Sequence, residues 1–262
     1  MLDLLGVPFD RCGRRAGSSL GPAALRVAGL AEALNGLGLA VSDSGDVHAP
    51  SDEASPTGIR HFGSARILYA ELRAAVLDTL NAGRTPLVLG GDHSPSIGSV
   101  SAALHHAKDE LAVLWIDAHA DINTPEGSPT GNLHGMPISV LLGRESKIGG
   151  TSGEQWKQLA AEMVPKHRLS PGRIGWIGLR DVDEAERAAI RDLEGAFPST
   201  MQDVDLHGLR RVVDACDRWL RASGATKLWI SFDVDVLDPI LAPGTGTAVR
   251  GGLSYREGHL LA

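Results

Sequence analysis

The segment from Leu111 to Asp121 reads LAVLWIDAHAD and constrains the fold more than any other part of the chain. Its first half, Leu111–Ile116, has no charged residue and predicts a strand buried on both faces, as in a parallel sheet. Asp117, His119 and Asp121 follow, with one ionisable group at every second position. Side chains two apart on an extended backbone point to the same side, and three such groups are costly to desolvate without a partner. We therefore expect a cation at the end of this strand.

The rest of the chain alternates predicted strands with predicted helices. Strands are expected at Leu2–Phe9, Val41–Val47, Thr85–Leu89, Leu111–Ile116, Arg173–Leu179, Pro198–Val204 and Lys227–Phe232. Helices are expected at Ala23–Leu37, Ser64–Asn81, Ser96–Ala107, Thr151–Val164, Asp183–Leu193 and Leu206–Ala222. A Pro- and Ser-rich loop is expected between Val47 and about Thr57. This alternation predicts an α/β fold with a parallel sheet and helices on both sides. No repeat or linker divides the chain, so a single domain over residues 1–262 is predicted.

Composition removes several classes of function. The net charge is −7 and no Lys/Arg-rich run is present, which argues against a nucleic-acid surface. No apolar stretch is long enough to cross a bilayer, and no signal peptide is recognisable. The two cysteines, Cys12 and Cys216, have neither CxxC spacing nor a secretory context, so we expect reduced thiols in a cytoplasmic protein.

Two other predicted strands also end in groups that bind metals. His93 follows one of them, and Asp233 and Asp235 follow another. Ligands collect at the carboxyl edge of an open α/β sheet, so two imidazoles and four carboxylates are expected to meet there. This oxygen-rich set suits Mn²⁺ better than a structural zinc ion. The negative charge would balance two divalent ions if some carboxylates bridge them, and a bridged pair lowers the pKa of a shared water.

Each motif taken alone has a simpler interpretation. The Asp-x-His-x-Asp pattern could cap a helix, hold one structural ion or form a salt-bridge cluster, and the histidine after Gly-Gly-Asp could be an ordinary turn residue. Their joint occurrence at three strand ends of one sheet favours a metal centre.

The three motifs resemble those of the ureohydrolases, the family that contains arginase and agmatinase. They are GGDHS at 90–94, DAHAD at 117–121 and SFDVDVLDP at 231–239, within a match from Gly6 to Glu257. The resemblance, which is closest to the arginases, implies a three-layer α/β/α sandwich with a mostly parallel central sheet. It also implies a dimanganese centre that hydrolyses a guanidino group to urea and an amine.

Carried over residue by residue, the resemblance implies that each ion has one histidine and one aspartate of its own and that two aspartates bridge the pair. The ligands are His93 and Asp121 for one ion, His119 and Asp235 for the other, and Asp117 and Asp233 as bridges. Asp121 would also pass a proton from the attacking hydroxide to the leaving amine. His134 matches a histidine that shuttles protons to solvent, although it could instead simply pack in its loop.

The loop from 121 to 135 is similar to the arginase loop that binds the amino-acid end of the substrate. Asn123, Ser128 and Thr130 match positions that bind the α-carboxylate, and Asn132 lies beside them. Agmatine has no carboxylate and would not need these groups, so the resemblance favours L-arginine.

Two further segments complete the implied substrate site. Asp183, and Asp181 through water, match acids that meet the α-ammonium group, although both could instead be acids that favour a helix start. Thr247 is similar to a threonine that lines the guanidinium pocket.

The chain departs from the arginase pattern after Tyr255-Arg256-Glu257-Gly258. Arginases continue through a helix to a further strand in the middle of the sheet, and a glutamate at its end binds the guanidinium. Here the sequence ends at Ala262, so we expect a gap in the sheet with unpaired backbone groups. A truncated chain and a shortened relative with a rearranged sheet are both possible, and the intact upstream motifs favour truncation.

The resemblance leaves three functions open. The leading hypothesis is hydrolysis of L-arginine to L-ornithine and urea with two Mn²⁺. The alternatives are an agmatinase or other guanidino-acid amidinohydrolase, and a weakly active metal-binding relative. Family members are trimers or hexamers, and Arg256 and Glu257 resemble residues that meet a neighbouring subunit, so a homo-oligomer is expected.

Overall fold

The computed structural model describes residues 1–53, 57–164 and 166–262, and its described part contains seven strands. One sheet has the order β2-β1-β3 and the other the order β6-β5-β4-β7, and every strand pair is parallel. The strands are β1 (Leu2–Gly6), β2 (Val41–Asp46), β3 (Thr85–Leu89), β4 (Leu111–Ile116), β5 (Ile174–Leu179), β6 (Phe197–Thr200) and β7 (Lys227–Phe232). The predicted α/β class and its parallel strands are confirmed.

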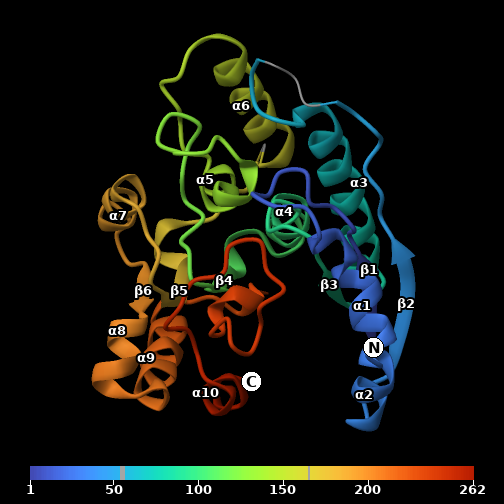
Figure 1. The fold of residues 1–262 in the computed structure, drawn as a ribbon, viewed down its shortest axis with the longest axis vertical. Helices are drawn as coiled ribbons and strands as arrows, with labels where there is room; N and C mark the ends of the chain where they lie inside the picture. The colour runs from blue at the N-terminus through green and yellow to red at the C-terminus, as the bar shows by residue number, and fades with distance from the viewer. Residues whose placement is uncertain (54–56, 165) are drawn as a thin grey trace.

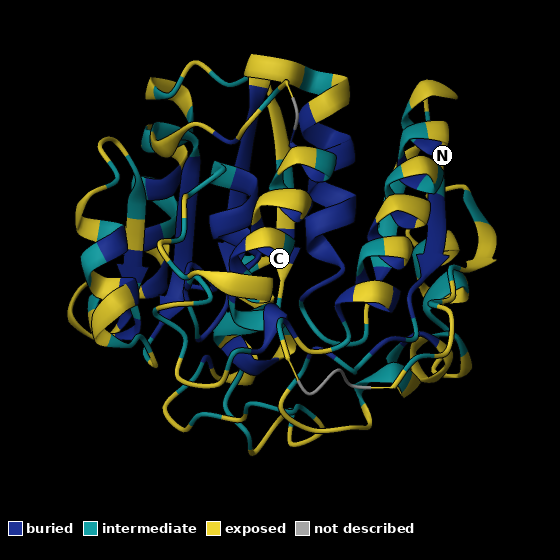
Figure 2. Ribbon diagram, turned by 90° about the horizontal axis from the view of Figure 1, so that it is seen from above, coloured by how far each residue is buried: buried dark blue, intermediate teal, exposed yellow. Residues whose placement is uncertain are grey.

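Helices flank both sheets with their outer faces exposed; β1, β4 and β5 are buried, whereas β2 and β7 are largely exposed (Figures 1 and 2). The helices are α1 (Gly21–Val27), α2 (Leu30–Gly36), α3 (Phe62–Asn81), α4 (Ser96–Ala107), α5 (Pro137–Leu142), α6 (Gly150–Met163), α7 (Glu184–Arg191), α8 (Met201–His207), α9 (Leu209–Ala222) and α10 (Tyr255–Leu261). Helix α4 is buried over most of its length and contacts α3, β4 and β7, so it packs α3 against the β6-β5-β4-β7 sheet. Among the described residues, none of these helices combines the length and apolar character needed to cross a bilayer.

Three sequence predictions about local structure need correction or limitation. The helix expected at Ala23–Leu37 is two helices, because Gly29 adopts a φ of 83° between them. The strand expected at Pro198–Val204 ends at Thr200, whose side chain caps α8 together with Asp203 in a reciprocal capping box. Residues 54–56 of the expected Pro- and Ser-rich loop lie outside the described residues.

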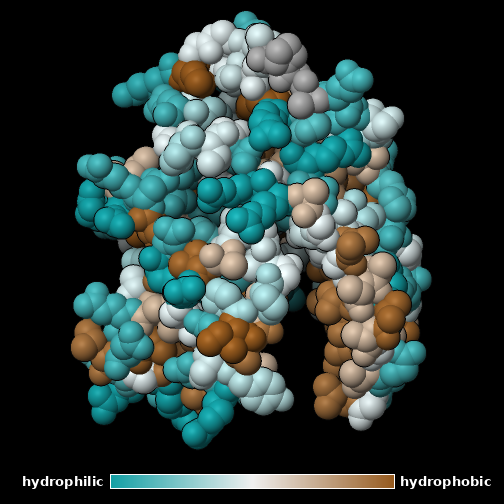
Figure 3. Space-filling view, viewed as in Figure 1, coloured by the Kyte–Doolittle hydropathy of each residue, from teal (hydrophilic) through white to brown (hydrophobic). Residues whose placement is uncertain are grey.

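The strands form two sheets that end at β3 and at β7, and a gap in the sheet was expected from the resemblance. Within the described residues each of these strands pairs on one side only. Leu228, Ile230 and Phe232 alternate along β7 and are 43%, 57% and 51% exposed. Figure 3 shows the surface hollowed between α10 and the apolar wall formed by α1 and α2. Strand β7 is therefore an edge strand with one apolar face in solvent.

This edge position predicts that substitutions at two neighbouring residues of β7 change the stability by very different amounts. Trp229 packs against two separate core clusters, whereas Ile230 points into solvent. Trp229→Ala is expected to lower the free energy of unfolding by about 3 kcal/mol, and Ile230→Ser to change it by less than about 0.5 kcal/mol. Chemical denaturation of both variants measures the difference, and a large loss for Ile230→Ser would show that this face is covered in solution.

Candidate metal centre

The candidate ligands gather at the carboxyl edge of the strands, where three loops meet. His93 lies between β3 and α4, and Ser96 at the start of α4 donates through its hydroxyl to the His93 carbonyl at 2.6 Å. Asp117, His119 and Asp121 follow β4. Asp233 and Asp235 follow β7, and the backbone N–H of Asp233 donates to the carbonyl of Ile116 at 2.9 Å. Pairing of β4 with β7 thus brings two of the loops together, and α4 carries the third onto them.

Two histidine–carboxylate groups form at this edge and share Asp117. His93 Nδ1 lies 3.0 Å from Asp117 Oδ2, 3.1 Å from Asp121 Oδ2 and 3.2 Å from Asp233 Oδ2. His119 Nδ1 lies 3.3 Å from Asp117 Oδ1 and 3.2 Å from Asp235 Oδ2. The two oxygens of Asp117 therefore face different histidines, and all six expected ligands meet around this one carboxylate.

His93 is oriented with a free nitrogen directed at the carboxylates. Its Nε2 lies 2.8 Å from Ser231 Oγ, and its ring stacks on Trp115 with centroids 4.1 Å apart. Its Nδ1 is buried and, among the described residues, has no hydrogen-bond partner of acceptable geometry, despite three carboxylate oxygens nearby. An orphaned imidazole nitrogen among carboxylate oxygens is the donor set that a divalent cation requires. The residues present therefore fit a metal ion.

The pKa shifts of the two histidines also indicate a site for a cation. Burial lowers the pKa of His119, but its bonds to Asp117 and Asp235 outweigh this and raise the pKa to about 12. Burial likewise lowers the pKa of His93, and its neighbouring carboxylates raise it well above the ordinary value. Without a cation these histidines hold protons that offset the surrounding negative charge, and a metal ion would take the place of those protons.

Asp121 reaches the centre through an unusual backbone conformation. The chain bends directly after β4 and Asp121 adopts a φ of 51°, so the three groups do not converge on an extended backbone as the sequence predicted. Aspartate tolerates this left-handed region better than most residues do. The bend is held by the Trp176 indole N–H, which donates to the Ala120 carbonyl at 3.0 Å. Burial, followed by the nearby charge of Asp117, raises the pKa of Asp121 to about 8.

Arg180 holds the loop after β7 against β5 and was not recognised from the sequence. Its guanidinium donates to the carbonyls of Asp235, Val236 and Val249. In the sequence it is an ordinary arginine beside Asp181, because its partners lie more than fifty residues away. The same loop brings Thr247 to the centre, where its hydroxyl donates to Asp235 Oδ2 at 2.8 Å.

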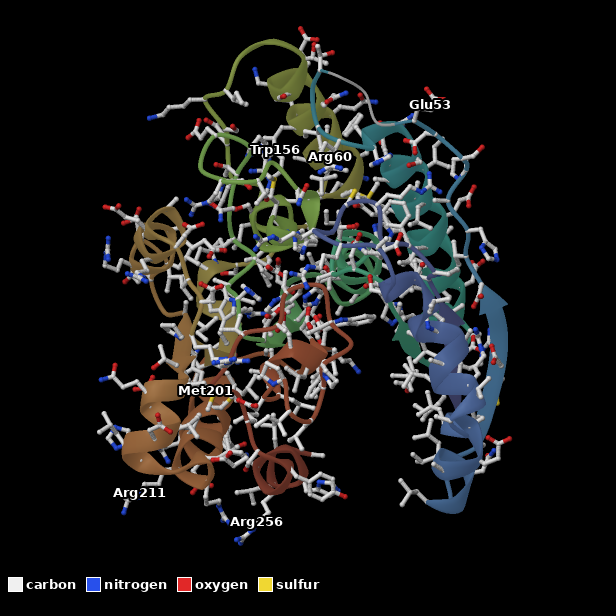
Figure 4. The ribbon with its side chains drawn as sticks, viewed as in Figure 1. Glu53, Arg60, Trp156, Met201, Arg211 and Arg256 are labelled. Carbon is white, nitrogen blue, oxygen red and sulfur yellow. The ribbon has the colours of Figure 1, made fainter. Side chains whose placement is uncertain are left out.

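The hydroxyl groups of the 124–132 loop bond within the loop itself. Ser128 Oγ accepts the backbone N–H of Gly131 at 3.0 Å, and Thr130 Oγ1 accepts that of Asn132 at 3.3 Å. The two hydroxyls also lie 3.5 Å apart, so at most one O–H is used between them and at least one remains able to donate to an anion. The side-chain oxygen of Asn132 accepts from Arg60, which is labelled in Figure 4.

The two acids expected at the ammonium end differ in their surroundings. Asp183 caps α7 by accepting the backbone N–H of Glu186 and also accepts from Asn123 Nδ2 at 2.7 Å. Asn123 Oδ1 is buried with no partner among the described residues, so an acceptor remains open there. The side chain of Asp181 is 65% exposed and lies 3.6 Å from His119 Nε2, which places an exposed carboxylate at the rim of the centre.

His134 lines a small cavity of about 70 Å³ together with His93, Asp233 and Thr247. Burial, followed by positive charge on His119 and His93, lowers the pKa of His134 to about 4. His134 is therefore neutral at pH 7, with one N–H and one bare ring nitrogen. A larger recess of about 470 Å³ lies beside α7, and the described residues that line it include no carboxylate and no histidine.

Glu186 ties α7 to the loop after β4. It is 5% exposed, and its carboxylate accepts the backbone N–H groups of Asp183 at 3.2 Å and Ile122 at 3.3 Å. Burial, followed by the charge of Asp183, raises the pKa of Glu186 from 4.5 to about 7. Folding therefore favours the protonated form, so this contribution to stability is complete below pH 4.5 and is lost as the pH rises through about 7.

Glu186→Gln is expected to remove this pH dependence in the metal-free protein. Glutamine removes the charge and keeps one of the two acceptor oxygens; the loss of the other acceptor does not depend on pH. The variant should gain up to about 3 kcal/mol relative to the unchanged protein on going from pH 5 to pH 8. Urea denaturation at the two pH values measures the gain. Glu184→Gln, on the exposed side of the same first turn, serves as the control, and an equal shift in both variants would contradict the assignment.

Comparison with known proteins agrees with this geometry. The Arginase family matches residues 2–262. An arginase of Staphylococcus aureus (strain COL) is 39% identical over 263 residues, which cover 98% of this chain and 82% of the relative. Among solved structures, arginase from Bacillus caldovelox has a TM-score of 0.86 and 38% identity, with 99% of this chain and 84% of that chain covered. Arginase of Entamoeba histolytica in complex with L-ornithine has a TM-score of 0.84 and 28% identity, with 98% and 82% covered. With its family match, its similarity to arginases over nearly the whole of its own length and its paired histidine–carboxylate groups, this chain belongs to the arginase family.

Proposed function

We propose that this protein hydrolyses the guanidino group of L-arginine, converting L-arginine and water to L-ornithine and urea. The observation that carries the proposal is the pair of histidine–carboxylate groups that share Asp117. Similarity to arginases over nearly the whole chain, including one whose structure holds L-ornithine, supports the same reaction.

The proposed cofactor is two Mn²⁺ per chain. Oxygen-rich ligands of this kind favour Mn²⁺, and the carboxylates can balance two divalent charges. One ion would be held by His93 and Asp121 and the other by His119 and Asp235, with Asp117 and Asp233 shared; the two directions of the Asp117 oxygens support its bridging role. When bound, such a pair supplies Lewis-acid activation of water at neutral pH.

Asp121 and His134 are the proposed groups that move protons. Asp121 lies 3.1 Å from His93 Nδ1, inside the ligand cluster, and can take a proton from the attacking water and give it to the departing amine nitrogen. His134 lines the cavity beside His93, and this position supports its role as a relay of protons between the cluster and solvent.

The proposed substrate contacts follow the charges at the two ends of L-arginine. The hydroxyls of Ser128 and Thr130 can donate to the α-carboxylate, and Asn123 and Asn132 complete that side of the loop. Asp183 and the exposed Asp181 would attract the α-ammonium group. Near the centre, we propose that Thr247 lines the guanidinium pocket; its bond to Asp235 supports that position.

A comparison of three substrates tests the proposed function. After incubation with Mn²⁺, urea release is measured with L-arginine, agmatine and 4-guanidinobutyrate, alongside elemental analysis of the protein. We expect L-arginine to have the highest kcat/KM. A preference for agmatine would overturn the assignment of the 124–132 loop, and metal uptake without urea from any substrate would indicate a metal-binding protein.

We further propose a cytoplasmic homo-oligomer, as a trimer or hexamer. Arg256 projects from α10 (Figure 4), and Glu257 accepts from Ser254 at the start of that helix, which leaves the Arg256 guanidinium accessible to a neighbouring subunit. Light scattering of the purified protein would establish the stoichiometry.

A further inference from the structure

We infer that Trp115 is a positioning residue for one of the two metal ions, the ion on the His93 side. This inference depends on the proposed metal centre. Trp115 lies on β4, two residues before Asp117, and is fully buried. The apolar strand around it suggests a residue that only fills the core, yet both its ring and its N–H reach candidate ligands.

The indole N–H fixes one oxygen of the shared carboxylate. Trp115 Nε1 donates to Asp117 Oδ2 at 3.0 Å, and the backbone N–H of His119 donates to Asp117 Oδ1 at 2.7 Å. Each carboxylate oxygen has two lone pairs, so each can accept one of these bonds and still offer a lone pair to an ion. Two donors on opposite oxygens prevent rotation of the group and hold it in a bridging orientation.

The indole ring also limits the movement of His93. The two rings are stacked with an interplanar angle of 14°. Because Ser231 is in contact with the other ring nitrogen, the imidazole is restrained both in its plane and across it. Trp115 therefore acts on two ligands at once, with the N–H on Asp117 and the ring face on His93.

Both contacts lie on the same side of the centre. Asp117 Oδ2, which receives the indole N–H, is the oxygen that faces His93, whereas Asp117 Oδ1 faces His119. Among the described residues Trp115 makes neither a hydrogen bond nor a ring contact to His119 or Asp235. Loss of the N–H should therefore weaken one ion much more than the other. Trp115 is 0% exposed, so water cannot readily replace the missing donor.

Trp156 provides a matched control. It is also almost fully buried, and its indole N–H also makes a single bond, to the carbonyl of Arg144 at 2.9 Å. It lies on α6 in a different core cluster (Figure 4). A change that merely disturbs packing should have similar consequences at Trp115 and Trp156.

Two substitutions at each position separate the N–H from the packing. Trp→Phe removes the N–H and part of the ring, while replacement by 3-benzothienylalanine exchanges the N–H for sulfur and keeps the bicyclic shape. Mn²⁺ binding to each metal-free protein is titrated by calorimetry and by the electron paramagnetic resonance signal of free Mn²⁺, and thermal unfolding without metal checks the fold.

We expect both changes at Trp115 to weaken one Mn²⁺ binding event by about 10-fold or more, with the other event altered by less than about 2-fold. Both changes at Trp156 should leave the two events unaltered. Equal affinities for the unchanged protein and the benzothienyl variant at position 115 would overturn the inference, as would an equal loss at position 156. If the unchanged protein bound no Mn²⁺, the proposed metal centre itself would be wrong, and this inference with it.

Discussion

Replacing Asp121 with asparagine is expected to slow urea release by about 1,000-fold, within the usual range for loss of a group that transfers protons. Asparagine has nearly the same shape but cannot take up the proton that this step requires. It also tolerates the left-handed backbone conformation at position 121, where φ is 51°. The fold should therefore survive, and the loss should fall on kcat rather than on stability.

The measurement pairs urea release at saturating L-arginine with thermal unfolding and metal analysis of the same sample. Asp214→Asn, which removes an exposed carboxylate paired with Arg210 on α9, is the control and should retain full activity. If Asp121→Asn kept more than about a tenth of the rate while binding the metal normally, Asp121 could not be the proton carrier.

The six expected metal ligands could be predicted from the sequence because they come directly after predicted strands. An apolar run such as Leu111–Ile116 predicts a buried parallel strand, and polar groups that follow such strands meet at one edge of the sheet. That argument needs only local patterns and the parallel direction of the strands. The structure brings five of these side chains into two groups that share Asp117, and Asp121 joins them through His93.

The residues that orient these ligands could not be predicted from the sequence in this way. Trp115 and Trp176 fit the apolar pattern of buried strands, and that pattern does not indicate that their N–H groups donate to Asp117 and to the Ala120 carbonyl. Arg180 satisfies carbonyls from the loop after β7, and Ser231 contacts a histidine far away in the sequence. These roles depend on tertiary placement, which residue type and periodicity do not encode.

The start of α7 contains one contact that the sequence pattern indicates and one that it does not. Asp183 was expected either as a ligand for an ammonium group or as an acid at a helix start, and the structure places it as an N-cap that also accepts from Asn123. The spacing of Asp183 and Glu186, three residues apart, is itself typical of a helix N-cap. The bond from Ile122 to Glu186, which joins this cap to the metal loop, is not indicated by the sequence pattern.

The double variant Ser128→Ala/Thr130→Val is expected to lower kcat/KM for L-arginine by about 100-fold, because one hydrogen bond to a charged group contributes roughly 1.5–3 kcal/mol. Both hydroxyl oxygens already accept backbone N–H groups, and the hydroxyls lie 3.5 Å apart, so at least one of their protons is available to a carboxylate. Valine keeps the shape of threonine, and alanine removes only the serine hydroxyl. The loss should therefore be confined to substrates that carry an α-carboxylate.

Agmatine provides the internal reference, because it has the guanidino group of arginine without the carboxylate. Its turnover by the double variant should remain within about 3-fold of the unchanged protein, well below the effect of losing one bond to a charged group. Ser223→Ala is the control, because Ser223 also accepts a backbone N–H two residues on, at 3.2 Å, but lies at the end of α9. An equal fall for both substrates would place the damage in the metal centre rather than in carboxylate recognition. An unchanged kcat/KM for L-arginine would show that the carboxylate binds elsewhere.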